Sequence, residues 1–494
     1  MAEPEFDVVV VGGGGAGLMA AYMAARENRR VILLEKQPDF GGTTGISVGT
    51  ICTTSTDLQR AAGIADSPQA HFEDMEKFHP ASLSGRDNLE LRRLLVENVP
   101  AAFRVLVDLG IEFVGPFPEG AHRCPRLHAI VPHSRGYIHH LLRACRHKGV
   151  DLRANSSVMG LIAENGRIAG VKTINGSGAT SEIRARNGVV LATGDFSSAS
   201  RAFKEEFLPP ELLKSGGINP ASHGDGQRLG VEAGGEILNG DLALGPEIRF
   251  VAPKNAKLPA RLPPWRWIAK IISTAMRTLP DRILRPLLLS YVTTYLAPSH
   301  GMFAAGAILI NREGKRFCNE LERPQDRLGD QPKQEAFIVF DGAIARNFRS
   351  WPHFISTAPG VGYAYLQDYQ RSRRDICFQA TSWEELAALI GVPADALMTG
   401  IKAYNKEADR LGRPPLLQAP FFALGPAKPW IVFTEGGLRV NTSLNVLDRA
   451  GNPIPGLYAA GSAGQGGLLL EGHGHHLGWA FTSGYLAGSN AARR

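Results

Sequence analysis

Apolar residues near the N-terminus form short continuous runs separated by a stretch with helical periodicity. Residues 6–11, FDVVVV, are a β-branched run typical of a strand buried in a parallel sheet. A glycine-rich turn and the apolar-periodic stretch LMAAYMAAREN follow, and RVILLE then predicts a second buried strand that ends at Glu35. This order of strand, turn, helix and strand predicts a βαβ unit.

The rest of the chain divides into regions of different texture. Residues 55–150 show helical periodicity, and Asn165-Gly166 and Asn175-Gly176 then mark hairpin turns between alternating runs. Residues 240–428 are richer in proline, aromatic and basic residues, whereas the last segment returns to strands, a glycine-rich loop and a helix from about Trp479. We therefore predict an α/β protein, with a Rossmann-like domain built from both termini (1–239 and 430–494) and an inserted α+β capping domain (240–429).

The composition is that of a folded globular protein. The chain has 494 residues, of which 44% are hydrophobic and 20% are charged, and these values exclude wholesale disorder. The net charge of +7 comes without dense basic runs typical of nucleic-acid binding, except for one basic region at 261–285. We expect neither a metal site nor a disulfide framework, because no CxxC pair occurs among Cys52, Cys124, Cys145, Cys318 and Cys377.

The sequence gives no sign of export. The N-terminal segment MAEPEFDVVVVGGGG lacks the basic and apolar regions of a signal peptide. The sequence as a whole contains no clean apolar stretch of the roughly 18 residues that a spanning helix needs. We expect a cytoplasmic protein.

A dinucleotide-binding fingerprint occupies the first turn. Gly12, Gly14 and Gly17 form G-x-G-x-x-G between a strand and a helix, where glycines allow a tight turn and close approach to a pyrophosphate. The helix N-terminus supplies amide donors and a positive dipole end to the phosphates. Glu35 ends the second strand, where a carboxylate accepts hydrogen bonds from ribose hydroxyls and repels a 2′-phosphate. These features predict FAD or NAD.

Three further segments favour FAD over NAD. The loop Gly41-Gly42-Thr43-Thr44 follows Glu35 closely and would place hydroxyl and amide groups near a flavin, where a nicotinamide domain would continue into a helix. Ala192-Thr193-Gly194 and GLYAAGSAG each resemble a strand that ends at a cofactor. The residues expected to bind FAD are Gly12, Gly14, Gly15, Ala16, Gly17, Glu35, Lys36, Gly42, Thr43, Thr44, Gly49, Val158, Ala192, Thr193, Gly194, Asp225, Gly461, Ser462 and Leu477.

Three stretches of the chain carry a family resemblance. The first is VVVVGGGGAGLMAAYMAARENRRVILLEKQPDFGGTT, the second is GAILINREGKRFCNE, and the third is TEGGLRVNTSLNVLDRAGNPIPGLYAAGS. In this order they resemble the flavoprotein family that includes fumarate reductase and succinate dehydrogenase flavoprotein subunits and 3-ketosteroid dehydrogenases. The resemblance implies hydride transfer between flavin N5 and a substrate carbon, at the junction of the two domains. Membrane-bound relatives attach FAD through a histidine after the second glycine loop, but this chain has Thr43 and Thr44 there, so we expect non-covalent FAD.

The resemblance to fumarate reductases breaks down at the positions that hold a dicarboxylate. The histidine expected before TEGG is replaced by the apolar pair Val432-Phe433, and the arginine of the C-terminal loop falls near Glu471. The third cationic group corresponds to Arg323 or Arg327. A C4-dicarboxylate would therefore bind poorly.

The C-terminal loop is more similar to the ketosteroid dehydrogenase branch. EGHGHHLGWAFTSGYLAG follows the shape of that branch, in which a tyrosine and a glycine amide polarise a substrate ketone. Gly474 matches the glycine, but Leu470 stands where the tyrosine belongs, so another donor is needed. His473, His475 and His476 are available, and histidine can donate to an oxyanion or accept a proton. Alternatively, these histidines cap the helix or face solvent.

The group that removes a proton next to the ketone is less well defined by the sequence. Tyr291 and Tyr295 lie on one face of an expected helix just before GAILIN, and tyrosines of the capping domain are bases in the ketosteroid branch. Alternatively, both are core aromatics. His122, His128 and His133 lie in a segment that approaches the substrate in relatives.

Residues 261–285 combine basic side chains, two tryptophans and an apolar helical face. Such segments lie on membrane interfaces and contact anionic lipid. An enzyme with an apolar substrate could use one to reach its substrate or a quinone acceptor. Alternatively, the segment packs on the protein core as part of the capping domain.

These observations together predict an FAD-dependent dehydrogenase. We expect α,β-dehydrogenation of an apolar cyclic ketone, steroid-like or alicyclic, with His473 and Gly474 at the carbonyl, His475 as a further candidate and a tyrosine as base. An external acceptor, such as a quinone, must then reoxidise the flavin. One alternative is a fumarate-type or enoate reductase, which a carboxylate-binding arginine in the capping domain would favour. Another is a non-catalytic electron-transfer flavoprotein.

Overall fold

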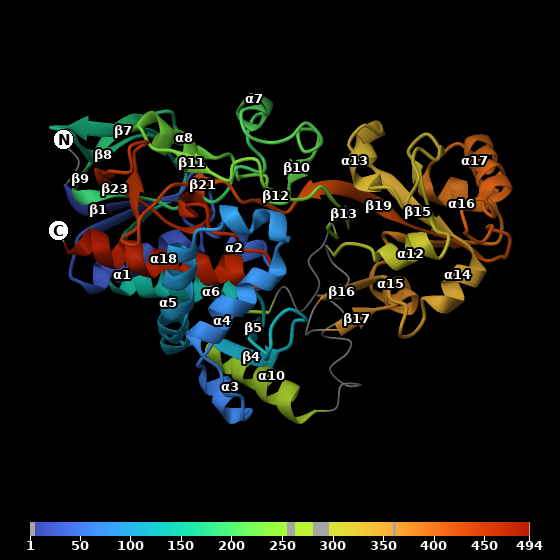
Figure 1. The fold of residues 1–494 in the computed structure, drawn as a ribbon, viewed down its shortest axis with the longest axis horizontal. Helices are drawn as coiled ribbons and strands as arrows, with labels where there is room; N and C mark the ends of the chain where they lie inside the picture. Colours follow the sequence, from blue (N-terminus) through green and yellow to red (C-terminus); the bar gives the residue numbers. More distant parts are fainter. Residues whose placement is uncertain (1–4, 254–261, 280–295, 359–361, 494) are drawn as a thin grey trace.

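The main sheet is formed by strands from both ends of the chain, in the order β22-β23-β9-β1-β2-β6 (Figure 1). The computed structural model describes residues 5–253, 262–279, 296–358 and 362–493. The pairs β6–β2, β2–β1, β1–β9 and β9–β23 are parallel, β22 is antiparallel at one edge, and the hairpins of β7, β8 and β9 extend the sheet. The strands are β1 (Phe6–Val11), β2 (Val31–Leu34), β6 (Asp151–Arg153), β7 (Ser156–Glu164), β8 (Arg167–Asn175), β9 (Thr180–Leu191), β22 (Asn445–Leu447) and β23 (Pro453–Ala459).

The first and last long helices pack closely against each other beside this sheet. Both α1 (Gly15–Arg26) and α18 (His475–Ala492) are largely buried. A Cβ at Gly488 would lie 2.2 Å from the carbonyl oxygen of Ala20, so only glycine allows this close approach. The sequence predicted that the last helix begins near Trp479, but it begins at His475 because Gly474, in the left-handed conformation, precedes it as the N-cap.

A second sheet of six strands has its own hydrophobic core, which runs from Ile248 to Ala427 (Figure 1, right). Strand β10 belongs to this sheet although it precedes residue 240, because it pairs with the long strand β19. Two-stranded ladders, β11–β21 and β12–β20, connect the segments near the two predicted domain boundaries. The strands of the six-stranded sheet are β10 (Gly216–Gly217), β13 (Glu247–Phe250), β14 (Ile308–Asn311), β15 (Ala336–Phe340), β18 (Cys377–Ala380) and β19 (Phe421–Ile431). The strands of the two-stranded sheets are β11 (Ile237–Leu238), β12 (Ala243–Leu244), β20 (Phe433–Thr434), β21 (Gly437–Leu438), β16 (Ser356–Ala358) and β17 (Gly362–Ala364).

A small antiparallel sheet of β3 (Thr50–Cys52), β5 (Leu127–Val131) and β4 (Glu112–Phe117) lies below the main sheet in Figure 1. Helix α10 (Arg266–Thr278) packs beside β4, and His140 of α6 contacts the carbonyl oxygen of Pro264 with its Nε2 at 3.1 Å. We call the part of the chain around the main sheet the first unit and the part around the six-stranded sheet the second unit. Although α10 lies within the range predicted for the capping domain, it packs on the first unit. None of the helices in the described ranges is both long and apolar enough to cross a bilayer.

The remaining α-helices of the described residues are short, with the exception of α5, α6 and α17. The helices predicted from the periodicity of residues 55–150 are found as α4, α5 and α6. The helices are α2 (Gly42–Ile46), α3 (Asp57–Ala61), α4 (Pro68–Met75), α5 (Leu89–Asp108), α6 (Arg135–His147), α7 (Arg201–Glu205), α8 (Asp225–Glu232), α12 (His300–Ala304), α13 (Pro324–Leu328), α14 (Gly342–Asn347), α15 (Leu366–Ser372), α16 (Trp383–Ile390) and α17 (Ala394–Glu407).

The close contact between α1 and α18 gives a first prediction. Gly488→Ala should lower the free energy of unfolding by about 1–3 kcal/mol, the usual cost of inserting an atom into a packed interior. Gly160→Ala is the matched control, because a Cβ there meets nothing within 4 Å and should change stability by less than about 0.5 kcal/mol. Urea unfolding of both variants measures the difference, and equal midpoints would contradict the packing described.

Candidate flavin and substrate site

One cavity of about 2320 Å³ collects loops from both ends of the chain. The turn after β1, the end of β9, the loop after β23 and the start of α18 all line it. Sites for small ligands usually have volumes of about 300–1,000 Å³. This cavity can therefore hold a dinucleotide and a second ligand together.

The first glycine turn is packed in the way that the fingerprint predicts. Gly12 has φ +106°, and a Cβ at Gly17 would lie 1.9 Å from the Gly12 carbonyl oxygen, so α1 packs directly on the turn. Gly14 and Gly15 face the cavity where α1 begins. The amides at this helix start are suited to bind a pyrophosphate.

Glu35 lies directly beside this turn. Its Oε2 accepts a hydrogen bond from the amide of Gly13 at 2.7 Å, and its Oε1 accepts one from the amide of Gln37 at 2.8 Å. These bonds fix the carboxylate on the cavity wall. Lys36 and Asp225 form an ion pair of 2.7 Å on the same wall. A fixed carboxylate beside the glycine turn suits an unphosphorylated ribose.

Every residue predicted to bind FAD lines this cavity except Gly17, whose place is in the packing of α1 on the turn. Their individual contacts with FAD stay predictions. The second glycine segment differs from the expected loop, because the amide of Gly45 bonds the carbonyl oxygen of Gly41 at 3.0 Å and starts the short helix α2. Thr44 of this helix accepts a hydrogen bond from the amide of Gly15 at 3.2 Å, so the two glycine segments are joined. The donor set and the volume fit FAD.

The three histidines of the C-terminal loop lie in three different environments. His473 is exposed at the cavity wall, where its Nδ1 lies 2.6 Å from Oε1 of Glu119. His476 lines the cavity with its ring on Phe433, at 3.8 Å between ring centroids. His475 is buried and does not line the cavity, so the prediction that it contacts substrate is wrong. As the first residue of α18 it turns toward the interior.

Nε2 of His476 is buried and has no hydrogen-bond partner. It lies 3.6 Å from Oε1 of Glu435, which is also buried without a partner. The neighbouring Glu471 lines the cavity, and burial, together with the charge of Glu435, raises the pKa of its carboxyl group. An imidazole beside a carboxylate can accept a proton and keep it, because the negative charge stabilises the protonated ring.

Gly474 occupies a position that only glycine fits. It has φ +84°, and a Cβ there would lie 2.5 Å from the amide nitrogen of Cys52. Its carbonyl oxygen accepts a hydrogen bond from that amide at 3.2 Å, which holds the loop against β3. The start of α18 therefore faces the cavity with the positive end of the helix dipole.

The predicted bases Tyr291 and Tyr295 lie outside the described residues. Among the described residues, Tyr363 of β17 is the tyrosine that lines the cavity. No motif marks it in the sequence. His133 also lines the cavity, whereas His122 and His128 are buried elsewhere, the latter with its Nε2 at 2.9 Å from Oγ1 of Thr56.

The cavity is poor in available positive charge. Each lysine and arginine on its described wall is paired with a carboxylate: Lys36 with Asp225, Arg228 with Glu232 and Arg249 with Glu247. Seven carboxyl side chains line the wall, namely Glu35, Asp39, Glu119, Asp195, Asp225, Glu247 and Glu471.

The positions that correspond, by the family resemblance, to the dicarboxylate-binding groups of fumarate reductases also place no free cation on the described cavity wall. Val432, Phe433 and Glu471 line the cavity, as the sequence comparison expected. Arg323 pairs with Asp326 at 2.6 Å on the surface, and neither it nor Arg327 lines the cavity.

Comparison with known families settles the cofactor. The sequence model described as "FAD binding domain" matches residues 7–247 and 293–469. The chain belongs to this family. It is a flavoprotein oxidoreductase, and FAD is its cofactor, as the glycine turn and Glu35 predict.

Curated relatives of this flavoprotein include reductases and a dehydrogenase. It is 28% identical to an NADH:fumarate oxidoreductase of Klebsiella pneumoniae, over 100% of the chain but only 48% of that protein. The flavoprotein thus spans about half the length of this relative. It is 25% identical to a 4-oxocyclohexanecarboxylate 2-dehydrogenase of Sinomonas cyclohexanicum, over 99% of the chain and 93% of that protein.

Two solved structures share the fold. A flavocytochrome c3 fumarate reductase in its open conformation superposes with a TM-score of 0.75 at 24% identity, over 100% of this chain and 79% of that one. A 3-ketosteroid Δ1-dehydrogenase of Sterolibacterium denitrificans superposes with a TM-score of 0.66 at 19% identity, over 99% of both chains. Similarity at this level establishes the α/β flavoprotein fold alone. Several of the curated relatives bear fumarate reductase or fumarate oxidoreductase names, so the ketosteroid branch remains a proposal.

The hydrogen bonds of Glu35 give a prediction for FAD binding. Glu35→Gln removes the charge that the amides of Gly13 and Gln37 orient toward the expected ribose, and bonds from hydroxyl groups to a charged acceptor are each worth about 1.5–3 kcal/mol. FAD should bind the apoprotein of this variant roughly ten- to hundredfold more weakly, measured by flavin fluorescence quenching. Glu27→Gln, on the exposed end of α1, is the control and should keep the wild-type affinity. Equal affinities in both variants would exclude the role assigned to Glu35.

Proposed function

We propose that this flavoprotein desaturates a neutral cyclic ketone beside its carbonyl group. The observation that carries the proposal is the absence of an unpaired lysine or arginine on the described cavity wall. A dicarboxylate brought into this cavity would lose its hydration and meet mainly carboxylates, which is unfavourable. A neutral ketone has no such cost.

The cavity wall also offers an apolar surface to such a substrate. Its described apolar side chains come from both units and from α10, and they include Phe78, Phe117, Leu244, Ile272, Met276, Leu296 and Phe433. Burial of a ring system against them is favourable at about 25 cal/mol per Å² of apolar surface. The curated relative that dehydrogenates 4-oxocyclohexanecarboxylate aligns over nearly its whole length, which supports a cyclic ketone. Because that substrate carries a carboxylate, the neutral charge proposed here rests on the paired cations of the cavity wall alone.

The described residues supply the proton chemistry. His476 accepts the proton from the carbon next to the carbonyl, and Glu435 stabilises the protonated ring. The start of α18 at Gly474 polarises the carbonyl oxygen, and His473, held by Glu119, donates from the cavity rim. Bound FAD would supply the acceptor for the hydride of the neighbouring carbon. The substrate thus loses one proton and one hydride, and an external acceptor takes up the two electrons.

Substitution of His476 tests this assignment. Because a general base contributes roughly 10²–10⁴-fold to rate, His476→Gln should lower ketone turnover with an artificial electron acceptor by about that factor while FAD content stays unchanged. Tyr363→Phe, at another residue that lines the cavity, is the matched control and should retain most of the activity. A large loss in Tyr363→Phe with full activity in His476→Gln would transfer the role of base to Tyr363.

Reduction of an enoate or of fumarate is the second candidate. The names of several curated relatives favour it, and Arg249 is an arginine of the second unit on the cavity wall. Glu247 holds this guanidinium at 2.7 Å, which opposes a carboxylate ligand there. Turnover of fumarate or an enoate with reduced viologen, but of no ketone with an oxidising acceptor, would replace the first proposal by this one. Neither turnover would favour an electron-transfer role.

We also propose that α10 contacts the anionic cytoplasmic surface of a membrane. Trp265, Trp267 and Ile271 are 49%, 59% and 61% exposed, and Arg266 and Lys270 lie among them. Ile272 and Met276 of the same helix line the cavity. One helix thus has a surface suited to lipid headgroups and a side facing the substrate cavity, which suits an enzyme that takes an apolar ketone or a quinone acceptor from a membrane.

Vesicle binding tests this surface. The double variant Trp265→Ala/Trp267→Ala should reduce cosedimentation with phosphatidylserine vesicles several-fold, because indole rings anchor at the headgroup level. Trp351→Ala, which removes an exposed tryptophan of the second unit, should leave it unchanged. Equal binding of the wild type to neutral and to anionic vesicles would exclude the electrostatic part of the proposal.

A further inference from the structure

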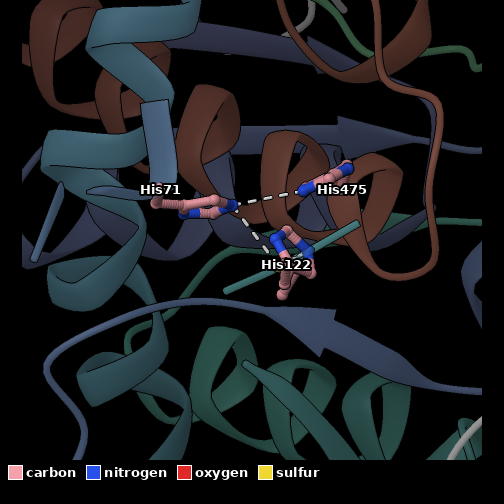
Figure 2. Close-up of side chains that lie close together, drawn as sticks. His71, His122 and His475 are labelled. Atoms are coloured by element: carbon pink, nitrogen blue, oxygen red, sulfur yellow. Dashed lines mark hydrogen bonds between the residues drawn. The ribbon is translucent and has the colours of Figure 1, made fainter. Parts of the chain in front are cut away.

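Four side chains from distant parts of the chain converge beneath the loop that contains His473. They are Cys52 of β3, His71 of α4, His122 of the segment between β4 and β5, and His475 at the start of α18, and all are buried. Figure 2 shows the three histidine rings turned toward one another. One ligand atom from each side chain lies within 4.8 Å of all the others. The cavity wall includes none of these residues.

The bond that His122 makes with its neighbour determines its tautomer. Nη1 of Arg126 donates to Nδ1 of His122 at 2.9 Å, so in the neutral ring the proton is on Nε2. Asp66 and Asp74 hold Arg126 in place through ion pairs. The Nε2–H of His122 therefore points to Sγ of Cys52, 3.3 Å away, as a donor.

The tautomer of His475 is fixed in the opposite sense. Its Nδ1 lies 2.6 Å from the carbonyl oxygen of Glu471 and donates a proton to it. Nε2 of His475 therefore has a free lone pair, and it lies 3.2 Å from Nε2 of His71. A histidine whose other nitrogen bonds a carbonyl is the usual arrangement for a metal ligand.

Without a further ligand, the donors and acceptors of this cluster cannot all form hydrogen bonds. If His71 donates from Nε2 to His475, Sγ of Cys52 has only ring N–H groups within hydrogen-bonding distance, at 3.3 and 3.4 Å. The proton of the thiol then has no acceptor, and Nδ1 of His71 is buried without a partner. A bound cation removes the need for an acceptor of the thiol proton, because the sulfur becomes a thiolate that accepts a hydrogen bond from the Nε2–H of His122.

Two of the separations between the proposed ligand atoms match those around a tetrahedral zinc ion, and the third pair lies within 4.8 Å. Bonds of about 2.3 Å to sulfur and 2.0 Å to nitrogen place two nitrogens roughly 3.3 Å apart, and a nitrogen and a sulfur roughly 3.5 Å apart. Nε2 of His71 lies 3.2 Å from Nε2 of His475 and 3.4 Å from Sγ of Cys52. These separations are close to those that a bound ion would impose.

We propose that Cys52, His71 and His475 bind a zinc-like divalent cation through Sγ and the two Nε2 atoms, with the Nε2–H of His122 donating to the thiolate. The bond of His475 to the Glu471 carbonyl oxygen leaves its Nε2 lone pair available, and Nε2 of His71 lies within 3.4 Å of both Nε2 of His475 and Sγ of Cys52. The ion displaces the thiol proton of Cys52 when it binds. The carboxylate of Glu119 lies 3.9 Å from Nε2 of His122 and adds negative charge nearby.

The ion would have a structural role. Phe78 lines the cavity and packs on His122 and His475, with ring centroids at 4.7 and 5.2 Å, so the cluster lies behind the cavity wall. The ion would tie β3 and α4 to the start of α18, next to the hydrogen bond that the amide of Cys52 donates to the carbonyl oxygen of Gly474. Its effect is therefore on the stability of the loop with His473, and it does not depend on the identity of the substrate.

Metal analysis of the purified flavoprotein tests the proposal. We expect one equivalent of zinc per chain in the wild type and in Cys318→Ser, a cysteine of the second unit, and its loss in Cys52→Ser and His71→Gln. His122→Gln should keep the ion with roughly 10–100-fold weaker affinity, because His122 only donates to a ligand. A His122 variant that loses the ion as completely as the Cys52 variant would overturn its assigned role.

Two measurements on the wild type hold if the variants fail to fold. Chelation should lower Tm, and Zn²⁺ but not Mg²⁺ should restore it. Co²⁺ added to the chelated protein should produce a thiolate charge-transfer band in the near ultraviolet. Less than a tenth of an equivalent of metal, with no Co²⁺ band and no change in Tm, would overturn the site, whatever the substrate proves to be.

Discussion

The close contact between α1 and α18 is the constraint on which the site depends. Gly484 and Gly488 bring α18 against the carbonyl oxygens of Ala16 and Ala20, so the first and last helices of the chain lie side by side. Both helices begin at the same cavity. The loop after β23 is fixed to α18 as well, because Ser483 accepts from the amide of Gly461 at 2.8 Å and Trp479 donates to its carbonyl oxygen at 3.1 Å. The glycine turn of one terminus therefore faces the histidine loop of the other.

Charge pairing on the cavity wall decides between the substrates that this fold can accommodate. Fumarate-type sites and ketone sites share the same arrangement of domains and the same hydride chemistry. The difference lies in whether cations are free to bind two carboxylates. Here Arg249 is held by Glu247, and the wall offers apolar rings, a helix start and a histidine beside a buried carboxylate. This favours a neutral substrate that must lose a proton.

The parts of the site that depend on local sequence were predictable, and those that depend on distant contacts were not. The glycine turn and Glu35 form one βαβ unit, so their spacing alone placed them. The start of α18 was placed at Trp479 because the apolar periodicity begins there, whereas the helix begins where Gly474 allows it. His473, His475 and His476 are neighbours in sequence, yet a turn of helix directs one of them away from the cavity. The cluster around Cys52 joins single residues from four separate segments of the chain, and no spacing motif covers such separations.

Anaerobic titration of the oxidised flavoprotein with cyclic 3- and 4-ketones is the sharpest test of whether it desaturates such a ring. At least one ketone should bleach the visible flavin band, because desaturation leaves two electrons on the cofactor when no acceptor is present. Fumarate should not reoxidise the dithionite-reduced protein at a comparable rate. Failure of all ketones to bleach the band, together with rapid reoxidation by fumarate, would contradict the account.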